Sequence, residues 1–168
     1  MTANDVFEIS MSLIDERLDT GVVDATSTAV YKKNAPYLLT LLQNDLVNDS
    51  NYFKTHTITK AAVTDTAGGY YPNTMPTDFF SSNQVISIET NGTYENASDY
   101  KWESNNILLI PDSFIGTIKV VYKPLPSAIT ALTDSLVLDT ITCSTTLAYG
   151  LASRLLTNEN SALANYFN

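Results

Sequence analysis

Cysteine and histidine are almost absent from this chain of 168 residues, which contains only Cys143 and His56. One cysteine cannot form an internal disulfide, and the two residues cannot supply a four-ligand zinc site. Their scarcity also argues against Cys–His pairs and histidine bases, and therefore against most hydrolase chemistry. We expect His56 to lie in a threonine-rich edge strand and Cys143 to be a small buried side chain.

Long hydrophobic runs are also missing. The longest, Leu38–Leu42 and Ile107–Ile110, are far shorter than the roughly 20 residues that a membrane span requires. The first residues lack the basic and apolar regions of a signal peptide. These features predict a soluble protein that is made in a cytoplasm and has no membrane partner.

Positive charge is scarce. Lys and Arg together number 9 against 18 Asp and Glu, which gives a formal net charge of −9. Sequence-independent binding of nucleic acid depends on basic side chains that neutralise phosphates, so the composition argues against strong binding of DNA.

Recognisable catalytic motifs are absent as well. The sequence has no GxSxG, HExxH, P-loop or dinucleotide-binding glycine pattern. Within the expected helices, only Asp15/Asp19 and Asp45/Asp49 pair carboxylates at i, i+4, a spacing that is typical of a solvated helix face. We therefore predict that the protein is not an enzyme and uses no cofactor or metal. An enzyme that relies on carboxylates alone is the remaining catalytic alternative.

Helical periodicity is present at both ends of the sequence. An apolar stripe from Phe7 to Leu18 predicts an amphipathic helix that is capped by Thr2 or Asn4 and ends near Gly21.

Two further helices follow from the same pattern. One begins near Asp24 to Ser27 and runs to about Val47, with a kink or a break at Pro36. The other follows a cap at Asp139, has apolar residues at helical spacing from Ile141 to Leu156, and stops around Thr157-Asn158. In the helix that begins near Asp24, the residues expected to be buried are Val30, Tyr31, Leu38, Leu39, Leu41, Leu42 and Leu46. The face that holds the helical core together is expected to combine Leu38, Leu41 and Leu42 of this helix with Leu147, Leu151 and Leu155 of the last one.

Between the helices the pattern changes to short β-favouring runs. Runs at 85–88, 100–102, 107–110 and 118–122 alternate with turn signals, of which Asn91-Gly92 is the clearest. They predict two adjacent hairpins or a small antiparallel meander, and the stretch 63–73 reads as a loop.

The fold class predicted from this order is α+β. We expect an antiparallel helical core from residues 1–50 and 127–168, with a small antiparallel β-sheet module inserted at 51–126. The inserted segment holds more aromatic residues than a sheet of this size needs for its own core, which indicates a surface that packs against another subunit or a ligand such as a sugar.

The insertion combines several segments that form a recognisable pattern: Tyr71-Pro72, Pro76-Thr77-Asp78-Phe79-Phe80, Tyr100-Lys101-Trp102-Glu103, Asn106–Pro111 and Gly116–Tyr122 with Pro124 and Pro126. This pattern resembles the β insertion of tailed-phage head-tail connector adaptors. The last segments, Leu147–Leu156 and Leu163–Phe167, are similar to the closing helices of that group. The likeness is one of overall pattern across most of the chain.

The resemblance implies a structural virion protein, assembled in the bacterial host cytoplasm. Its partners would be the portal protein, copies of itself in a ring (a dodecamer), and a stopper or tail component, with DNA passing through the channel without specific binding. Subunit and partner contacts would involve Phe79, Phe80, Trp102 and Tyr122 of the β module and Ser161, Leu163, Tyr166 and Phe167 of the last segment. The alternative is a carbohydrate- or peptide-binding module that uses exposed aromatic residues of the sheet.

Overall fold

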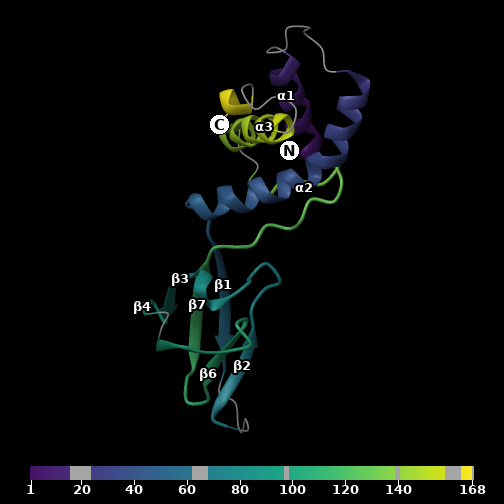
Figure 1. Ribbon diagram of the computed structural model, residues 1–168. Helices are drawn as coiled ribbons and strands as arrows, with labels where there is room; N and C mark the ends of the chain where they lie inside the picture. The colour runs from purple at the N-terminus through teal and green to yellow at the C-terminus, as the bar shows by residue number, and fades with distance from the viewer. Residues whose placement is uncertain (16–23, 62–67, 97–98, 139–140, 158–163, 168) are drawn as a thin grey trace. The chain divides into compact units, whose positions relative to one another are not determined.

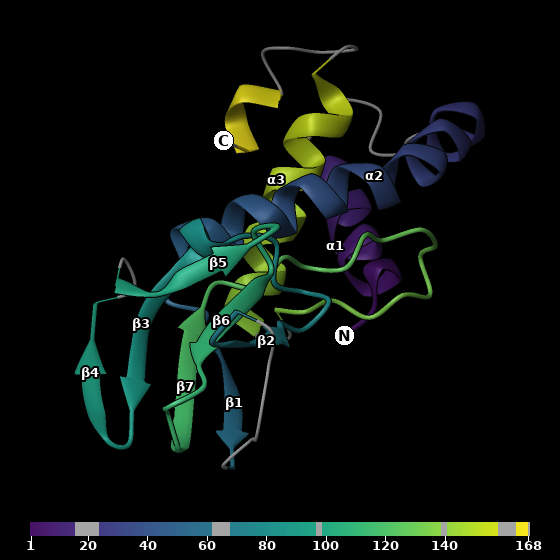
Figure 2. The same cartoon turned by 90° about the horizontal axis from the view of Figure 1, so that it is seen from below.

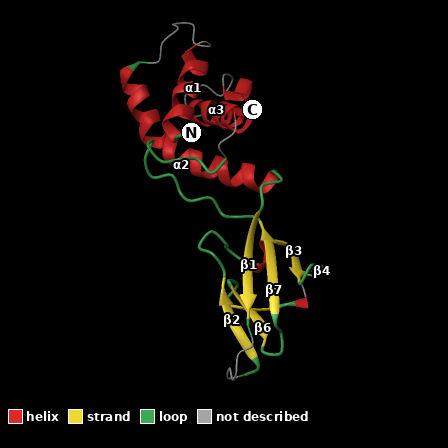
Figure 3. Ribbon diagram, turned by 180° about the vertical axis from the view of Figure 1, so that it is seen from behind, coloured by secondary structure: helices red, strands yellow, loops and turns green. Residues whose placement is uncertain are grey.

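The computed structural model describes residues 1–15, 24–61, 68–96, 99–138, 141–157 and 164–167 (Figure 1). The chain divides into two compact units, a helical unit made of Met1–Asp49 with Pro126–Asn168, and a β module made of Ser50–Leu125. The α-helices belong to the helical unit and the strands to the β module (Figure 3). The predicted α+β class with an inserted β module is therefore confirmed.

Helix α1 (Ala3–Asp15) begins at the cap that the sequence predicted. The Thr2 amide donates to Asp5 Oδ2 at 2.7 Å, and the Asp5 amide donates to Thr2 Oγ1 at 3.3 Å. This reciprocal pair is a capping box, which satisfies N–H groups that have no partner within the helix. The buried face of the helix consists of Ala3, Val6, Phe7, Ser10, Met11 and Ile14.

Helix α2 (Ala25–Asp49) is one continuous helix with Pro36 inside it. The Asp24 carboxylate caps it, with Oδ1 accepting the amides of Thr26 at 2.8 Å and Ser27 at 3.0 Å. The ribbon changes direction along its length (Figure 1), as expected of a helix whose proline removes a backbone donor. The predicted kink is present, and a break into two helices is not.

Helix α3 (Ile141–Leu156) has the bounds that the sequence predicted and packs against both α1 and α2. Gly150 permits close packing on α2, since a Cβ there would lie 2.8 Å from Leu42 Cδ2. The short 3₁₀ helix η3 (Asn165–Phe167) follows, and the Phe167 ring meets Tyr149 edge-on at 5.9 Å. Cys143 is half-buried, so its predicted full burial was wrong.

The extended segment that leads into α3 completes the helical unit. The Ala3 amide donates to Asp134 O at 2.9 Å, and the Ile129 amide donates to Thr40 Oγ1 at 2.8 Å. The Val137 amide donates to Gln43 Oε1 at 2.8 Å. These bonds hold the segment against α1 and α2, where Ile129 and Leu136 join the helical core.

The β module contains two antiparallel sheets. The first has the strand order β1-β7-β3-β4, which can be followed in Figure 2, and the second has the order β2-β6-β5. The strands are β1 (Lys54–Lys60), β2 (Tyr70–Thr74), β3 (Val85–Thr90), β4 (Thr93–Glu95), β5 (Lys101–Glu103), β6 (Ile107–Pro111) and β7 (Gly116–Tyr122), and the short 3₁₀ helix η1 (Ser82–Gln84) precedes β3.

Two hairpins form at turns that the sequence predicted, but they belong to different sheets, and the second strand of one, β4, lies outside the predicted runs. One is β3–β4, where Asn91 at φ 49° and Gly92 at φ 90° make the expected tight turn. The other is β5–β6, with Ser104 and Asn105 also at positive φ. A single meander was therefore the wrong alternative.

Three strands, β1, β2 and β4, lie outside the four strongest β-favouring runs. The threonine-rich β1 is an edge strand paired with β7, so His56 lies where the sequence placed it. Residues 70–73, expected as loop, belong to the strand β2 instead. Its Pro72 cannot donate to a neighbouring strand, but β2 is an edge strand, where this costs no ladder bond.

Candidate interaction surfaces

Asp78 links the start of β1 and the end of β7, which lie side by side, to the segment before β3. Its Oδ2 accepts Lys54 Nζ at 2.6 Å, and its Oδ1 accepts the Tyr122 hydroxyl at 2.7 Å. Its backbone carbonyl accepts the Leu125 amide at 2.7 Å. Asp78 therefore fixes the place where the chain enters and leaves the β module, and it positions the neighbouring Phe79.

Phe79 lies at the centre of the β module's core. Its ring stacks on Trp102 at 5.4 Å and 14°, and it meets Tyr122 edge-on at 5.2 Å and 74°. Phe79 and Tyr122 are 4% and 2% exposed, and Trp102 is partly buried beside them. The prediction that Phe79 and Tyr122 are surface anchors is therefore corrected, because their rings are occupied in holding the two sheets together. The core they share also includes Ile58, Met75, Ile88, Leu108, Ile110, Ile118 and Val120.

Other large apolar side chains of the β module do face solvent. Phe80 is 68% exposed and Tyr94 on the edge strand β4 is 73% exposed. Ile86 is 51% exposed and is the extra residue of a β-bulge, since Val85 and Ser87 oppose the consecutive residues Tyr122 and Val121. Bulges often redirect a side chain, and here the redirected side chain is that of the exposed Ile86. Of the four predicted aromatic anchors, Phe80 is the one that presents its ring to solvent.

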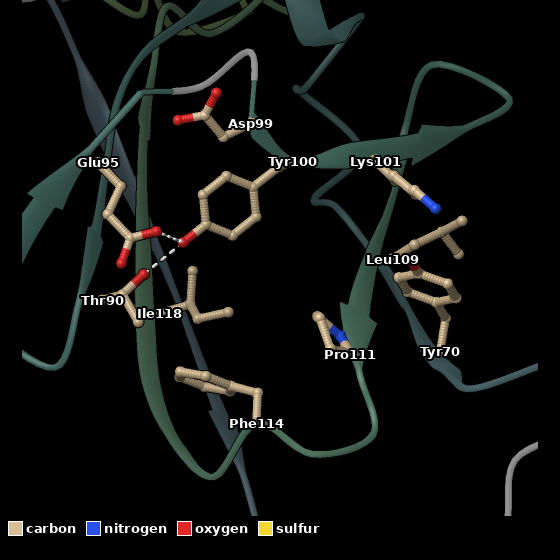
Figure 4. Close-up of a pocket in the computed structure, with 10 residues that line it drawn as sticks. All are labelled: Tyr70, Thr90, Glu95, Asp99, Tyr100, Lys101, Leu109, Pro111, Phe114 and Ile118. Atoms are coloured by element: carbon tan, nitrogen blue, oxygen red, sulfur yellow. Dashed lines mark hydrogen bonds between the residues drawn. The ribbon is translucent and has the colours of Figure 1, made fainter.

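A pocket of about 270 Å³ opens between the two sheets of the module (Figure 4). The Tyr100 hydroxyl donates to Glu95 Oε2 at 2.6 Å and lies 2.5 Å from Thr90 Oγ1. On the other side of the pocket, Lys101 Nζ lies 4.5 Å from the centre of the Tyr70 ring. The remaining lining is Asp99, Leu109, Pro111, Phe114 and Ile118.

The environment of Tyr100 keeps its phenol protonated. Burial, reinforced by the hydrogen bond to the Glu95 carboxylate, raises the pKa of Tyr100 to about 12. The phenol is thus a neutral donor committed to Glu95, and the pocket offers aromatic faces with carboxylates at one side. That lining suits a ligand that stacks and donates hydrogen bonds.

The side chain of Lys60 supports one side of this pocket from below the surface of the module. It is 3% exposed, and its Nζ donates to the carbonyls of Asp112 at 2.8 Å and Phe114 at 2.9 Å. The strand β1 thereby holds the turn between β6 and β7, which carries the pocket residue Phe114.

The predicted contact residues of the last segment are only partly described. Phe167 is buried at 5% exposure in the helical core, so its predicted role as a partner contact is corrected. Tyr166 lies in η3, and Ser161 and Leu163 fall outside the described residues.

Among the described residues, no three His, Cys, Asp or Glu side chains gather to form a metal-binding group. Across that part of the chain, no helix combines the length and the hydropathy that crossing a bilayer requires.

Sequence reasoning did not single out Asp78, Lys60 or Tyr100. Charged residues and tyrosines between turn signals usually lie at the surface, and their burial depends on partners from distant strands. Only the aromatic content of the insertion signalled a packed centre here.

The Asp78 network predicts an acid-sensitive β module. Burial alone would raise the pKa of the Asp78 carboxyl. The hydrogen bonds from Lys54 and Tyr122, together with the Lys54 charge, outweigh burial and hold this pKa below the ordinary value of 3.8. The carboxylate therefore stabilises the fold fully above the ordinary pKa, and that stabilisation is lost as pH falls through the folded-state pKa. Because Lys54 is half-exposed, solvent screens its share.

We expect Asp78→Asn to lower the free energy of unfolding of the β module by about 1–2 kcal/mol at neutral pH. The difference from the wild type should shrink below the ordinary pKa of aspartate. Denaturant unfolding at several pH values, followed by the fluorescence of Trp102, measures it. Glu103→Gln on β5 is the control, and a pH-independent difference would contradict the assignment.

A scan against models of known protein families finds no match, and a search of curated proteins finds none.

Proposed function

We propose that this protein is a head-tail connector adaptor of a tailed bacteriophage. It forms a ring beneath the portal and joins the capsid to the neck or tail while leaving a channel for DNA. The observation that carries the proposal is the insertion of a self-contained β module, with exposed apolar side chains, between α2 and α3 of a self-contained helical unit.

This architecture supplies what an adaptor needs. A ring closes through head-to-tail contacts, which require two different surfaces on each subunit. A further surface must remain for the next component of the neck. Stable contacts of this kind bury about 800 Å² per partner, and large exposed side chains such as Phe80, Ile86 and Tyr94 are suited to such burial.

The charge distribution supports passage of DNA without binding. Residues 50–125 carry seven acidic and five basic residues, whereas the helical unit carries eleven acidic and four basic residues. Most of the net charge of −9 thus belongs to the helical unit. A channel wall formed by such a unit repels the phosphate backbone, so the genome slides along it.

The test is assembly with the portal protein encoded in the same genome. The two purified proteins are mixed and examined by size-exclusion chromatography with light scattering and by cryo-EM. A ring of this chain seated on the portal is the expected result. A chain that stays monomeric in that mixture contradicts the proposal.

The pocket of Figure 4 favours a second candidate, a carbohydrate- or peptide-binding module. Its aromatic walls and its carboxylates, Glu95 and Asp99, match the stacking and hydrogen-bonding needs of a sugar ring. Under this alternative, the monomer itself binds ligand at Tyr100 and Phe114, and the portal mixture leaves it unassembled.

A further inference from the structure

The helical unit carries a groove of about 250 Å³ between α2 and α3. Val30 and Tyr37 of α2 border it and are 48% and 67% exposed, although the sequence predicted Val30 to be buried. Asn34, Leu38, Arg154 and Leu155 complete most of the lining. Large apolar side chains exposed around a hollow are typical of a surface that receives a partner.

Among the residues that line this groove Arg154 is basic, and Lys33 lies on the face of α2 that borders it, in a unit that is otherwise acidic. In the described part of the helical unit the basic side chains are Lys32, Lys33 and Arg154. Lys33 follows Val30 by three residues and precedes Tyr37 by four, so all three share one face of α2. Arg154 lines the groove and donates to Asp45 Oδ2 at 2.8 Å, with both side chains exposed.

Helix α1 of the same unit presents the complementary surface. Asp5, Glu8, Ile9 and Ser12 are exposed and recur at i, i+3, i+4 and i+7, so they form one solvent-facing stripe. Ile9, 40% exposed, stands in this stripe between acidic side chains. An apolar side chain flanked by carboxylates matches an apolar groove bordered by cations.

We propose that the α2–α3 groove of one copy receives the Ile9 stripe of α1 from a second copy. Ile9 enters the groove beside Tyr37, and Glu8 pairs with Lys33. The contact joins two different surfaces, so repeating it builds a head-to-tail ring. This inference rests on the proposed connector function and names the subunit contact.

A second copy fits the groove better than other occupants because of charge. Copies of a chain with a net charge of −9 repel one another unless a basic surface of one meets an acidic surface of the next. The groove and the α1 stripe supply that match within the same helical unit, and their exposed apolar residues Ile9, Val30 and Tyr37 are not part of its core cluster.

Charge reversal tests the pairing. Glu8→Lys and Lys33→Glu each place like charges together, and each is expected to weaken self-association at least about tenfold. The double variant, or an equimolar mixture of the two single variants, restores opposite charges at every contact and should restore assembly. Native mass spectrometry and light scattering over a concentration series, with and without the portal protein, measure this. Glu103→Lys on β5 changes the net charge as Glu8→Lys does and is the matched control.

Cross-linking tests the geometry independently. In a Cys143→Ala background, Ile9→Cys combined with Tyr37→Cys should yield a ladder of disulfide-linked oligomers under mild oxidation. Either cysteine alone can give at most dimers. The ladder supports the proposal.

The remaining outcomes separate the two proposals. If the wild type forms rings but the charge variants assemble normally and no ladder appears, the groove contact is overturned while the connector function stands. If the chain stays monomeric at every concentration and with the portal protein, both are overturned.

Discussion

Replacing Phe79 by alanine is expected to lower the free energy of unfolding of the β module by about 3–5 kcal/mol, the usual cost of removing a buried aromatic ring. The ring is 4% exposed and contacts both Trp102 and Tyr122, so its loss opens a cavity between the two sheets. Trp102 is the only tryptophan and lies in the module, which makes its fluorescence a specific probe of module unfolding. Denaturant titration gives the change in midpoint and slope.

The adjacent Phe80 is the matched control. It is 68% exposed, and Phe80→Ala should change stability by no more than about 0.5 kcal/mol. Within the connector proposal, Phe80→Ala should instead weaken attachment to a partner. Equal unfolding midpoints for the two variants would contradict the central placement of Phe79.

Gly116→Ala should also destabilise the β module strongly, by about 2–4 kcal/mol. Gly116 has φ +139°, a conformation that side chains other than glycine rarely adopt, and a Cβ there would overlap the Asn91 side-chain amide. The Asn91 side chain already makes a hydrogen bond, because its Oδ1 accepts the backbone N–H of Thr117 at 2.9 Å. The substitution therefore adds strain and breaks a link between the β3–β4 turn and β7.

Gly92→Ala isolates the backbone part of this effect. Gly92 has φ +90° but no atom within 4 Å of the added Cβ, so only strain of about 1–2 kcal/mol is expected. Hydrogen exchange of the Thr117 amide distinguishes the two, since only Gly116→Ala should expose it. A smaller effect at position 116 than at 92 would contradict the close approach to Asn91.

The helices were largely predictable because their signals are local. The apolar stripe and the caps of α1 lie within a few residues of one another, and the bounds of α3 agree with the periodic run Ile141–Leu156. Pro36 predicted the disturbance of α2, but the sequence did not show that the helix would continue through it.

The sheets were less predictable because pairing is not local. Consecutive strands β6 and β7 belong to different sheets, and β1 pairs with β7 across most of the module. The stretch 70–73 reads as a loop because of Pro72, and only its edge position makes it a strand.

The candidate contact residues show the same limit. Phe79 and Phe80 are neighbours in a turn where the Phe79 amide donates to Pro76 O at 2.9 Å, and no strand periodicity indicates which ring faces inward. The partners of Lys60 lie in the turn between β6 and β7 and those of Asp78 in the strands β1 and β7, all distant in sequence. The class of fold could therefore be predicted, whereas the choice of exposed side chains required coordinates.

The placement of the β module within the chain also sets an order of synthesis. Residues 50–125 emerge from the ribosome as one continuous stretch and can fold as a unit before α3 is made. Helices α1 and α2 must wait for α3 to cover their apolar faces. The α2–α3 groove thus forms last, and under the proposed subunit contact nascent chains on a polysome do not capture one another before α3 is made.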